Sequence, residues 1–153
     1  MKLFQKKKNN KGFSLVELIV VVAIMAVLLG VLVPTLVRHI ETSKQSKDLD
    51  GVAEIRNSME IALANEKFSD LDVVFTCAGT VTVTRDATTI GTASGPDAST
   101  VTADYVNEVL DNLKNQADEF EFSCSSKKYK GKDIVFTIKN EHVSATVDGV
   151  AVE

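Results

Sequence analysis

Residues 11–41 read KGFSLVELIVVVAIMAVLLGVLVPTLVRHIE, and this stretch decides the fold. Between Glu17 and Arg38 lie twenty residues without a charge. As a helix they would span about 30 Å, the hydrocarbon thickness of a bilayer. Residues 1–12 contain five lysines and no acidic residue, a bias that places the N-terminus on the cytoplasmic side. The stretch therefore predicts a membrane-spanning helix with a cytoplasmic start.

Glu17 lies only four residues inside the apolar segment that begins at Phe13. A carboxylate is costly there unless it reaches water or a positive partner, and no sequence neighbour supplies a positive charge. Cleavage after Gly12 would supply one, because the new α-amino group of Phe13 is protonated near neutral pH. Glu17 is then either a tolerated juxtamembrane acid or the partner of that amine, in its own chain or in a neighbour.

This pattern resembles the class III signal of type IV pilins and their relatives, which a prepilin peptidase cuts between glycine and phenylalanine. Four features coincide over about residues 6–41: a basic leader, Gly12-Phe13, the acid at Glu17, and an uninterrupted apolar helix. The resemblance implies cleavage after Gly12 and N-methylation of Phe13 by the same peptidase. It also implies a break in the helix near Pro34.

A kink or local loosening of the helix is expected between Gly30 and Pro34. Proline lacks the N–H that would bond the carbonyl of Gly30, and glycine is a weak helix former. Many relatives carry a helix-loosening glycine eight residues before the proline, where this chain has Ala26. Both a simple bend and a functional hinge are compatible with this pattern.

The 153-residue chain has a formal net charge of −4 that is unevenly distributed. Beyond residues 1–12 it keeps twelve basic and twenty-one acidic residues, a net charge of −9. A general attraction to nucleic acid or anionic lipid is therefore not expected. An ordinary secretory signal fits less well, because its apolar core is about 7–15 residues long and ends at a small-residue cleavage site.

The pattern divides the chain into four segments. They are a leader (1–12), a transmembrane or filament-core helix (13–37), an amphipathic second half of that helix (38–68) and a globular β-rich head (69–153). The amphipathic half is defined by apolar residues at spacings of three and four, namely Leu49, Val52, Ile55, Met59 and Leu63. Gly51 interrupts this stripe and predicts a second bend.

The head is predicted to be mainly β-structure. Runs rich in β-branched residues or with strict alternation predict strands at 71–76, 80–84, 119–124, 133–139, 142–147 and 150–152. Residues 102–116 predict a helix capped by Thr102, and 80–102 include an exposed, Thr-rich loop region. The fold class is therefore α+β: a long N-terminal helix packed on a small antiparallel sheet with one further helix, as the pilin resemblance also implies.

Cys77 and Cys124 are the only cysteines, and both fall in or beside predicted strands. An even count in a domain outside the membrane favours a disulfide between them. Two buried free thiols are the alternative. No CxxC spacing is present, so neither a metal site nor a redox motif is predicted.

No catalytic motif occurs in the sequence, and we expect no enzyme, cofactor, metal or small-molecule substrate. His39 and His142 stand apart from each other, and Asp70 and Asp72 lack a calcium-loop pattern. A basic loop surrounds Tyr129, with lysines at 127, 128, 130 and 132. Nucleic-acid contact through stacking on Tyr129 is one interpretation of this loop, but a basic loop that is simply solvated is favoured.

The leading hypothesis is a structural subunit of a type IV pilus, an extracellular filament used in adhesion or twitching motility. The resemblance implies a single-pass precursor in the cytoplasmic membrane and a place in a cell-surface pilus after assembly. The implied partners are prepilin peptidase, other copies of the chain, minor pilins and a membrane assembly platform. One alternative is a type II secretion pseudopilin or a competence pilin. An alternative of another class is a membrane-anchored binding module that never polymerises.

Overall fold

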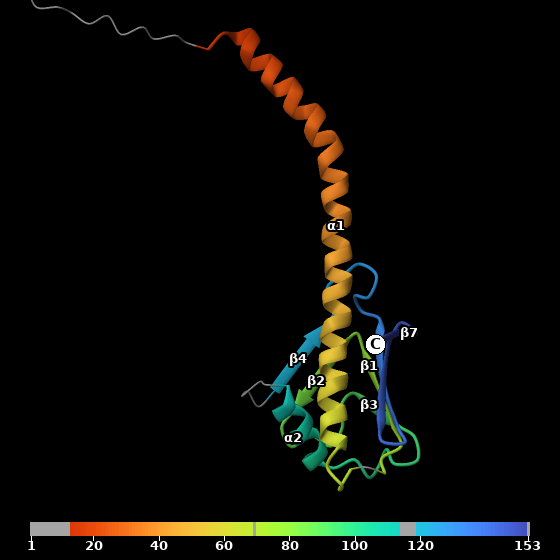
Figure 1. Cartoon of the computed structure of the whole chain (residues 1–153). Coiled ribbons are helices and arrows are strands. Elements are labelled where there is room, and N and C mark those ends of the chain that lie inside the picture. The colour runs from red at the N-terminus through yellow and green to blue at the C-terminus, as the bar shows by residue number, and fades with distance from the viewer. Residues whose placement is uncertain (1–12, 69, 114–118, 153) are drawn as a thin grey trace, which may run out of the picture. The chain divides into compact units, whose positions relative to one another are not determined.

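A computed structural model describes residues 13–68, 70–113 and 119–152 (Figure 1). The chain divides into two compact units, residues 1–39 and 40–153, and helix α1 (Leu15–Leu63) runs from the first into the second. We call residues 13–39 the anchor segment. From here on, the head means residues 40–152, which comprise the second half of α1 together with the β-rich part of the chain. The predicted leader, which includes Gly12, lies outside the described residues. The long helix, the antiparallel sheets and a second helix confirm the predicted α+β class.

The described residues of the head form two antiparallel sheets and helix α2. The bounds are β1 Val73–Ala78, β2 Thr80–Thr84, β3 Thr92–Ser94, α2 Ala103–Asn112, β4 Glu119–Ser123, β5 Asp133–Lys139, β6 His142–Val147 and β7 Val150–Val152. The larger sheet has the order β3-β1-β5-β6-β7, and the smaller one pairs β2 with β4. One sheet was expected. The second arises because Gly79, with φ of 77°, turns the chain sharply between β1 and β2.

Two tight hairpins order the C-terminal strands. Asn140 and Glu141 join β5 to β6 with φ of 51° and 61°, and Lys139 pairs with His142. Asp148 and Gly149 join β6 to β7 with φ of 52° and 77°. Positive φ at both central residues is the signature of a type I′ turn, whose twist matches that of the flanking strands. The Asp-Gly pair at 148–149 is typical of this turn.

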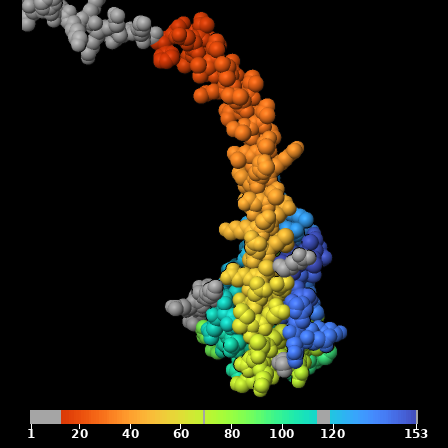
Figure 2. Space-filling model, in the orientation of Figure 1, coloured from red at the N-terminus to blue at the C-terminus, as the bar shows by residue number. Residues whose placement is uncertain are grey.

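The core of the head is built against the second half of α1. Figure 1 shows α2 and the two-stranded sheet on one side of this half and the five-stranded sheet on the other. The buried apolar residues that α1 contributes are Val52, Ile55, Met59, Ala62 and Leu63. This confirms the predicted stripe, with Leu49 only partly buried. The opposite side of this half stays on the surface, as the yellow part of Figure 2 shows.

Helix α2 lies within the predicted range 102–116 and packs through one apolar face, with Tyr105, Val106, Val109 and Leu110 buried. Thr102 occupies the N-cap position, but its side chain makes no capping hydrogen bond. The expected side-chain cap is therefore wrong, and Thr102 serves through its backbone carbonyl, which accepts from the Tyr105 N–H at 3.2 Å. The Tyr105 hydroxyl in turn donates to the Met59 carbonyl at 3.4 Å, which joins α2 to α1.

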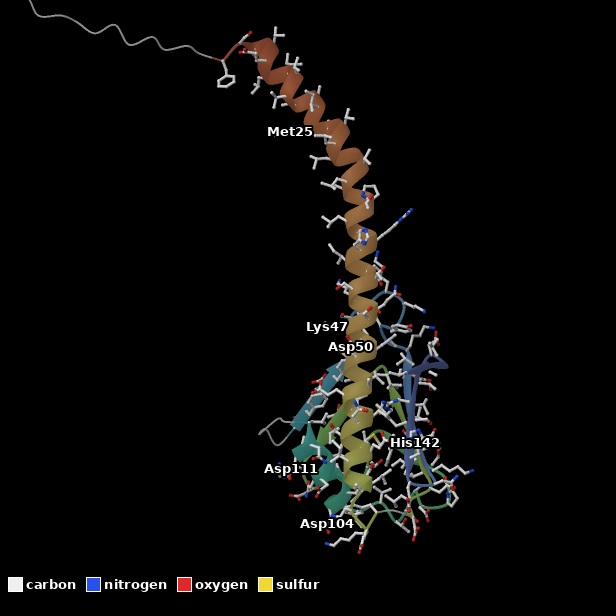
Figure 3. All side chains as sticks on the ribbon, in the orientation of Figure 1. Met25, Lys47, Asp50, Asp104, Asp111 and His142 are labelled. Atoms are coloured by element: carbon white, nitrogen blue, oxygen red, sulfur yellow. The ribbon has the colours of Figure 1, made fainter. Side chains whose placement is uncertain are left out.

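Two polar contacts hold the C-terminal strands to α1 within the head. Nη1 of Arg56 donates to the carbonyl of Val152 at 3.2 Å. Nδ1 of His142, labelled in Figure 3, lies 2.8 Å from a carboxylate oxygen of Glu60. Strands far along the chain are thus attached to the helix by side chains as well as by apolar packing.

Candidate functional site

Glu17 lies in the first turn of α1 and bonds back to the residue before the helix. Its Oε2 accepts a hydrogen bond from the backbone N–H of Ser14 at 2.9 Å, and the Ser14 carbonyl accepts from the Leu18 N–H at 3.2 Å. Ser14 is therefore the N-cap, and Glu17 stands at the third helical position, as in a capping box. The sequence Ser-Leu-Val-Glu at residues 14–17 matches the capping-box pattern. The charge of Glu17, considered alone, did not predict this contact.

This contact gives Glu17 a partner within the unprocessed chain. The partner is a neutral backbone donor and not the positive charge that the sequence lacks. A carboxylate at a helix N-terminus also interacts favourably with the helix dipole. Phe13, beside it, is 89% exposed. Glu17 can therefore be held at the start of the helix before any cleavage takes place.

The anchor segment exposes apolar side chains on every side of the helix. The window of α1 that qualifies as a candidate membrane span has a mean hydropathy of 3.1, and none of it is buried. Figure 3 shows its side chains, Met25 among them, standing out all round the ribbon. Among the described residues, α1 is the one helix long and apolar enough to cross a membrane. Such a surface needs lipid or other apolar helices around it.

Helix α1 includes Pro34 without an interruption in its assignment. The Thr35 hydroxyl donates to the Val31 carbonyl at 3.1 Å, one turn back on the same helix. A Cβ at Gly30 would meet nothing within 4 Å, so close packing inside the described chain does not explain this glycine. The expected loosening between Gly30 and Pro34 stays a prediction.

Asp48 is a buried carboxylate that fastens a distant loop to α1. It is 2% exposed, and its Oδ1 accepts from the Ser125 N–H at 2.9 Å and the Ser125 hydroxyl at 3.1 Å. Its Oδ2 accepts from the Ser126 N–H at 2.8 Å. Burial alone would raise the pKa of Asp48, but the hydrogen bonds from Ser125 and Ser126 outweigh it and hold the pKa below its ordinary value.

Sequence reasoning missed Asp48, although a signal was present. It stands four residues before Val52 and seven before Ile55, on the stripe that is otherwise apolar. A charged residue on a buried helix face requires hydrogen-bonding partners, and successive backbone N–H groups of a turn are suitable donors. The Ser-Ser pair that supplies them lies 77 residues away, so spacing alone does not reveal it.

Cys77 and Cys124 are both free thiols in the structure, which corrects the expected disulfide. Cys77 belongs to β1 of the larger sheet, whereas Cys124 follows β4 of the smaller one. The two buried cysteines, one in the larger sheet and one just after the smaller sheet, behave as small apolar residues of the core. Burial raises the pKa of each thiol to about 11, and the nearby charge of Asp48 adds to the effect at Cys124.

The loop around Tyr129 does not present an aromatic surface. Tyr129 is 2% exposed and belongs to the core, while Lys127, Lys128 and Lys130 are exposed. Its N–H donates to the Ser126 hydroxyl at 3.3 Å. Base stacking on Tyr129, which the sequence had suggested, is therefore not available.

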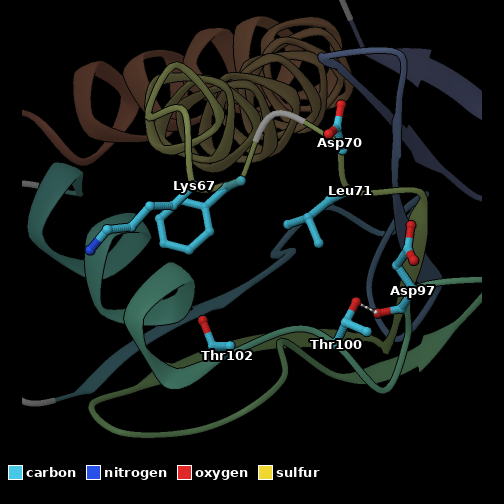
Figure 4. A pocket seen from close by; sticks show the side chains of 7 residues that line it. Lys67, Asp70, Leu71, Asp97, Thr100 and Thr102 are labelled. Carbon is cyan, nitrogen blue, oxygen red and sulfur yellow. Dashed lines mark hydrogen bonds between the residues drawn. The ribbon is translucent and has the colours of Figure 1, made fainter.

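Lys67 and Thr102 are among the residues that line a hollow of about 240 Å³ in the head, and Figure 4 shows their side chains around it. Asp97 lies on its rim, where its carboxylate accepts from the Asp72 N–H at 2.9 Å and its carbonyl accepts from the Thr100 hydroxyl at 2.8 Å. These bonds order the surrounding loop. Within residues 13–68, 70–113 and 119–152, no three His, Cys, Asp or Glu side chains are grouped to hold a metal ion.

Comparisons with known proteins each match only part of the chain. Residues 7–33 match the prokaryotic N-terminal methylation motif. The chain is 41% identical over 64 residues to a prepilin peptidase-dependent protein A of Clostridium perfringens, covering 41% of this chain and 46% of that one. It is 33% identical over 64 residues to a type IV major fimbrial protein of Dichelobacter nodosus, covering 42% and 40%. The chain thus spans less than half the length of either relative, and no solved structure matches it.

Proposed function

We propose that this chain, whose N-terminal segment is that of the type IV pilin family, is a structural subunit of a type IV pilus. One observation carries the proposal. The matched methylation motif, residues 7–33, overlaps the exposed apolar side chains of the first half of α1, which continue to Ile40. A processing signal and an unpartnered hydrophobic helix are the two requirements of a subunit that is trimmed and then packed against its copies.

The exposed helix supplies the driving contacts for assembly. In the precursor the anchor segment spans the cytoplasmic membrane, with the leader in the cytoplasm and the head outside. On assembly it leaves the bilayer and packs against the same segment of neighbouring copies. Because lipid and helix are similarly apolar, close side-chain packing rather than exclusion of water holds such a core together.

Glu17 sets the register between neighbouring copies. Prepilin peptidase cleaves after Gly12 and methylates the amine of Phe13, which then carries a positive charge one helical turn from Glu17. In the filament the carboxylate exchanges its bond with the Ser14 N–H for a charge pair with the Phe13 amine of an adjacent copy. A buried charge that loses its partner is strongly unfavourable, so only the register that pairs the two is stable.

The N-terminus of the exported protein tests this proposal. Mass spectrometry of protein recovered from the cell surface is expected to show a methylated Phe13 as first residue. An intact Met1, or a cut after Val37, would instead indicate a membrane-anchored module that does not polymerise. Gly12→Lys is a matched variant, because it changes only the residue before the cut and should leave the whole precursor in the membrane.

The remaining partners follow from the same proposal. Filament growth requires further copies of this chain, minor pilins and an assembly platform in the membrane. Pseudopilins of type II secretion and competence pilins share the N-terminal signal, so the signal alone does not separate them from a pilus subunit. Electron microscopy that shows long surface fibres labelled by an antibody to the head would support the pilus subunit.

A further inference from the structure

We propose that residues 125–132, here called the lysine loop, form a preordered cationic surface that binds the phosphate groups of anionic lipids. The surface acts at the outer face of the membrane, in the precursor that awaits assembly. This inference rests on the proposed function, since it requires the anchor segment to span the bilayer with the head outside.

The lysine loop is ordered by bonds to its backbone. Asp48 accepts from the N–H groups of Ser125 and Ser126, and Glu41 accepts from the N–H of Lys127. Inside the loop the Lys130 N–H donates to the Ser126 carbonyl at 3.0 Å. Ser126 is fully buried, which fixes the inner side of the loop. A surface already held in one conformation loses little entropy when it binds a ligand.

The outer side of the loop is cationic. It contains four lysines and no acidic residue. These four lysines are a third of the twelve basic residues that follow residue 12. Lys132 lies 3.5 Å from Asp148, and Lys128 lies over the ring of Tyr129 at 4.8 Å. The carboxylates of Glu41 and Asp48 are directed at the loop backbone. The net charge of the chain is negative, but charges in solution act mainly within a Debye length of about 8 Å. The loop can therefore attract anions locally.

The chain length between the apolar run and the loop limits where the loop can lie. Only four residue steps separate Val37, the last of the apolar run, from Glu41, and four steps reach at most about 14 Å when extended. Along a helix they cover about 6 Å. The headgroup layer on each side of a bilayer is about 5–8 Å thick. Glu41, and the loop bonded to it, therefore lies at or just above the headgroups, within reach of long lysine side chains.

Nucleic acid fits this surface less well than lipid does. Single strands are bound by grooves that combine positive charge with exposed aromatic side chains, and Tyr129 is buried. The net charge of −9 on residues 13–153 would also repel a long polyanion. Lipid phosphates reach the loop individually and need no extended groove.

Lysine acylation in reconstituted vesicles tests the inference. The full-length chain is inserted into vesicles of phosphatidylcholine alone or with about 30 mol % phosphatidylglycerol. A membrane-impermeant acylating reagent is added, and peptide mass spectrometry reads the rate at each lysine. In anionic vesicles the rates at Lys127, Lys128 and Lys130 are expected to fall about fivefold. About 0.5 M NaCl should restore them, because salt screens the attraction.

Exposed lysines elsewhere on the head provide the controls. Lys67 and Lys139 should react at the same rate in both kinds of vesicle. In a Lys127→Gln/Lys128→Gln variant, Lys130 should lose most of its protection by anionic lipid. A matched Lys67→Gln/Lys139→Gln variant should keep that protection. The substituted side chains are all exposed, so the fold is expected to be retained.

The outcomes separate this inference from the function on which it rests. A chain that floats with the vesicles but shows equal rates in both lipids overturns the lipid surface and leaves the pilus proposal standing. A chain that does not float with vesicles overturns both. Protection by a short DNA duplex in detergent, without protection by phosphatidylglycerol, would assign the loop to nucleic acid instead.

Discussion

The ring of Phe122 in β4 lies directly against the backbone of α1 at Gly51. A Cβ added at Gly51 would stand 2.6 Å from Cζ of Phe122, a separation that real Cβ contacts do not show. Glycine inside a helix costs about 0.5–1 kcal/mol relative to alanine. Gly51, which the sequence suggested as a bend, is therefore explained by the close approach of a strand to the helix.

Gly51→Ala is expected to destabilise the head by about 1–3 kcal/mol, even though alanine is the better helix former. The added methyl group must displace the Phe122 ring from its place on α1. Chemical denaturation of the full-length chain in detergent, followed by circular dichroism, measures the loss.

Gly30→Ala is the control, because a Cβ there meets nothing within 4 Å. It should leave the stability of the head unchanged. Adding Phe122→Leu to Gly51→Ala should recover part of the loss. Equal stability of Gly51→Ala and the unaltered chain would contradict the close contact.

Asp48→Asn is expected to destabilise the head by about 2 kcal/mol, because buried hydrogen-bond donors lose a partner. Oδ2 accepts from the Ser126 N–H, and an amide nitrogen in that position would face another donor. Asp50→Asn is the matched control, since Asp50, labelled in Figure 3, is exposed and lies one half-turn away. It should change stability little.

Stability should also fall in acid through Asp48. The folded-state pKa of Asp48 is lowered from its ordinary value of 3.8, so its contribution is fully present above that value. It is lost as the pH falls through the lower, folded-state pKa. Denaturation curves between neutral pH and pH about 2 should show this loss in the unaltered chain and a shallower one in Asp48→Asn. Parallel curves for the two would show that Asp48 does not couple folding to protons.

Glu17→Ala and Glu17→Gln separate the two contacts that we assign to this side chain. Glutamine keeps an oxygen for the Ser14 N–H but has no charge, whereas alanine removes both. Processing and membrane insertion should be intact in both variants. Filament yield, compared by immunoblot of the sheared surface fraction, should fall at least tenfold in both, because a register set by charge loses at least about 1.4 kcal/mol of preference.

Normal yield from Glu17→Gln with low yield from Glu17→Ala would assign the role of Glu17 to helix capping. Normal yield from both would remove Glu17 from assembly altogether. Glu54→Gln, an exposed acid on the head half of α1, serves as the control for handling and expression.

Cys77 and Cys124 should react as free thiols only after unfolding. With a pKa of about 11, each thiol is ionised in about one molecule in a thousand at pH 8, and both are buried. Alkylation of the native chain should be slow, and alkylation in denaturant without reductant should add two labels. If the denatured chain takes up labels only after a reductant is added, the two cysteines are joined by a disulfide and the prediction of free thiols is wrong.

Local pattern predicted much of the fold. Strands β5 and β6 have the predicted bounds because each alternates in burial and is followed by a residue with positive φ, Asn140 or Asp148. The buried stripe of α1 followed from helical spacing in the same way. At the candidate site, Phe13 and Glu17 were singled out because a carboxylate in an apolar run is conspicuous, and their roles stay predictions.

What the sequence missed depends on contacts between distant residues. Strand β3 is three residues long, polar and at a sheet edge, so it lacks an alternating apolar pattern. The bond from Asp48 to Ser125 and the packing of Phe122 on Gly51 each join segments more than seventy residues apart. The disulfide was inferred from the even number of cysteines, which carries no information on the distance between Cys77 and Cys124.

The bond from Arg56 to the carbonyl of Val152 spans 96 residues. Since β7 is also the edge strand of the larger sheet, the amphipathic half of α1 gains its last polar partner only when this strand is in place. A chain that enters the membrane by its N-terminal end would therefore be anchored long before its head is closed. Under the proposed function, a subunit would be ready for assembly only after this final hairpin had been exported, which is a later step than insertion of the helix.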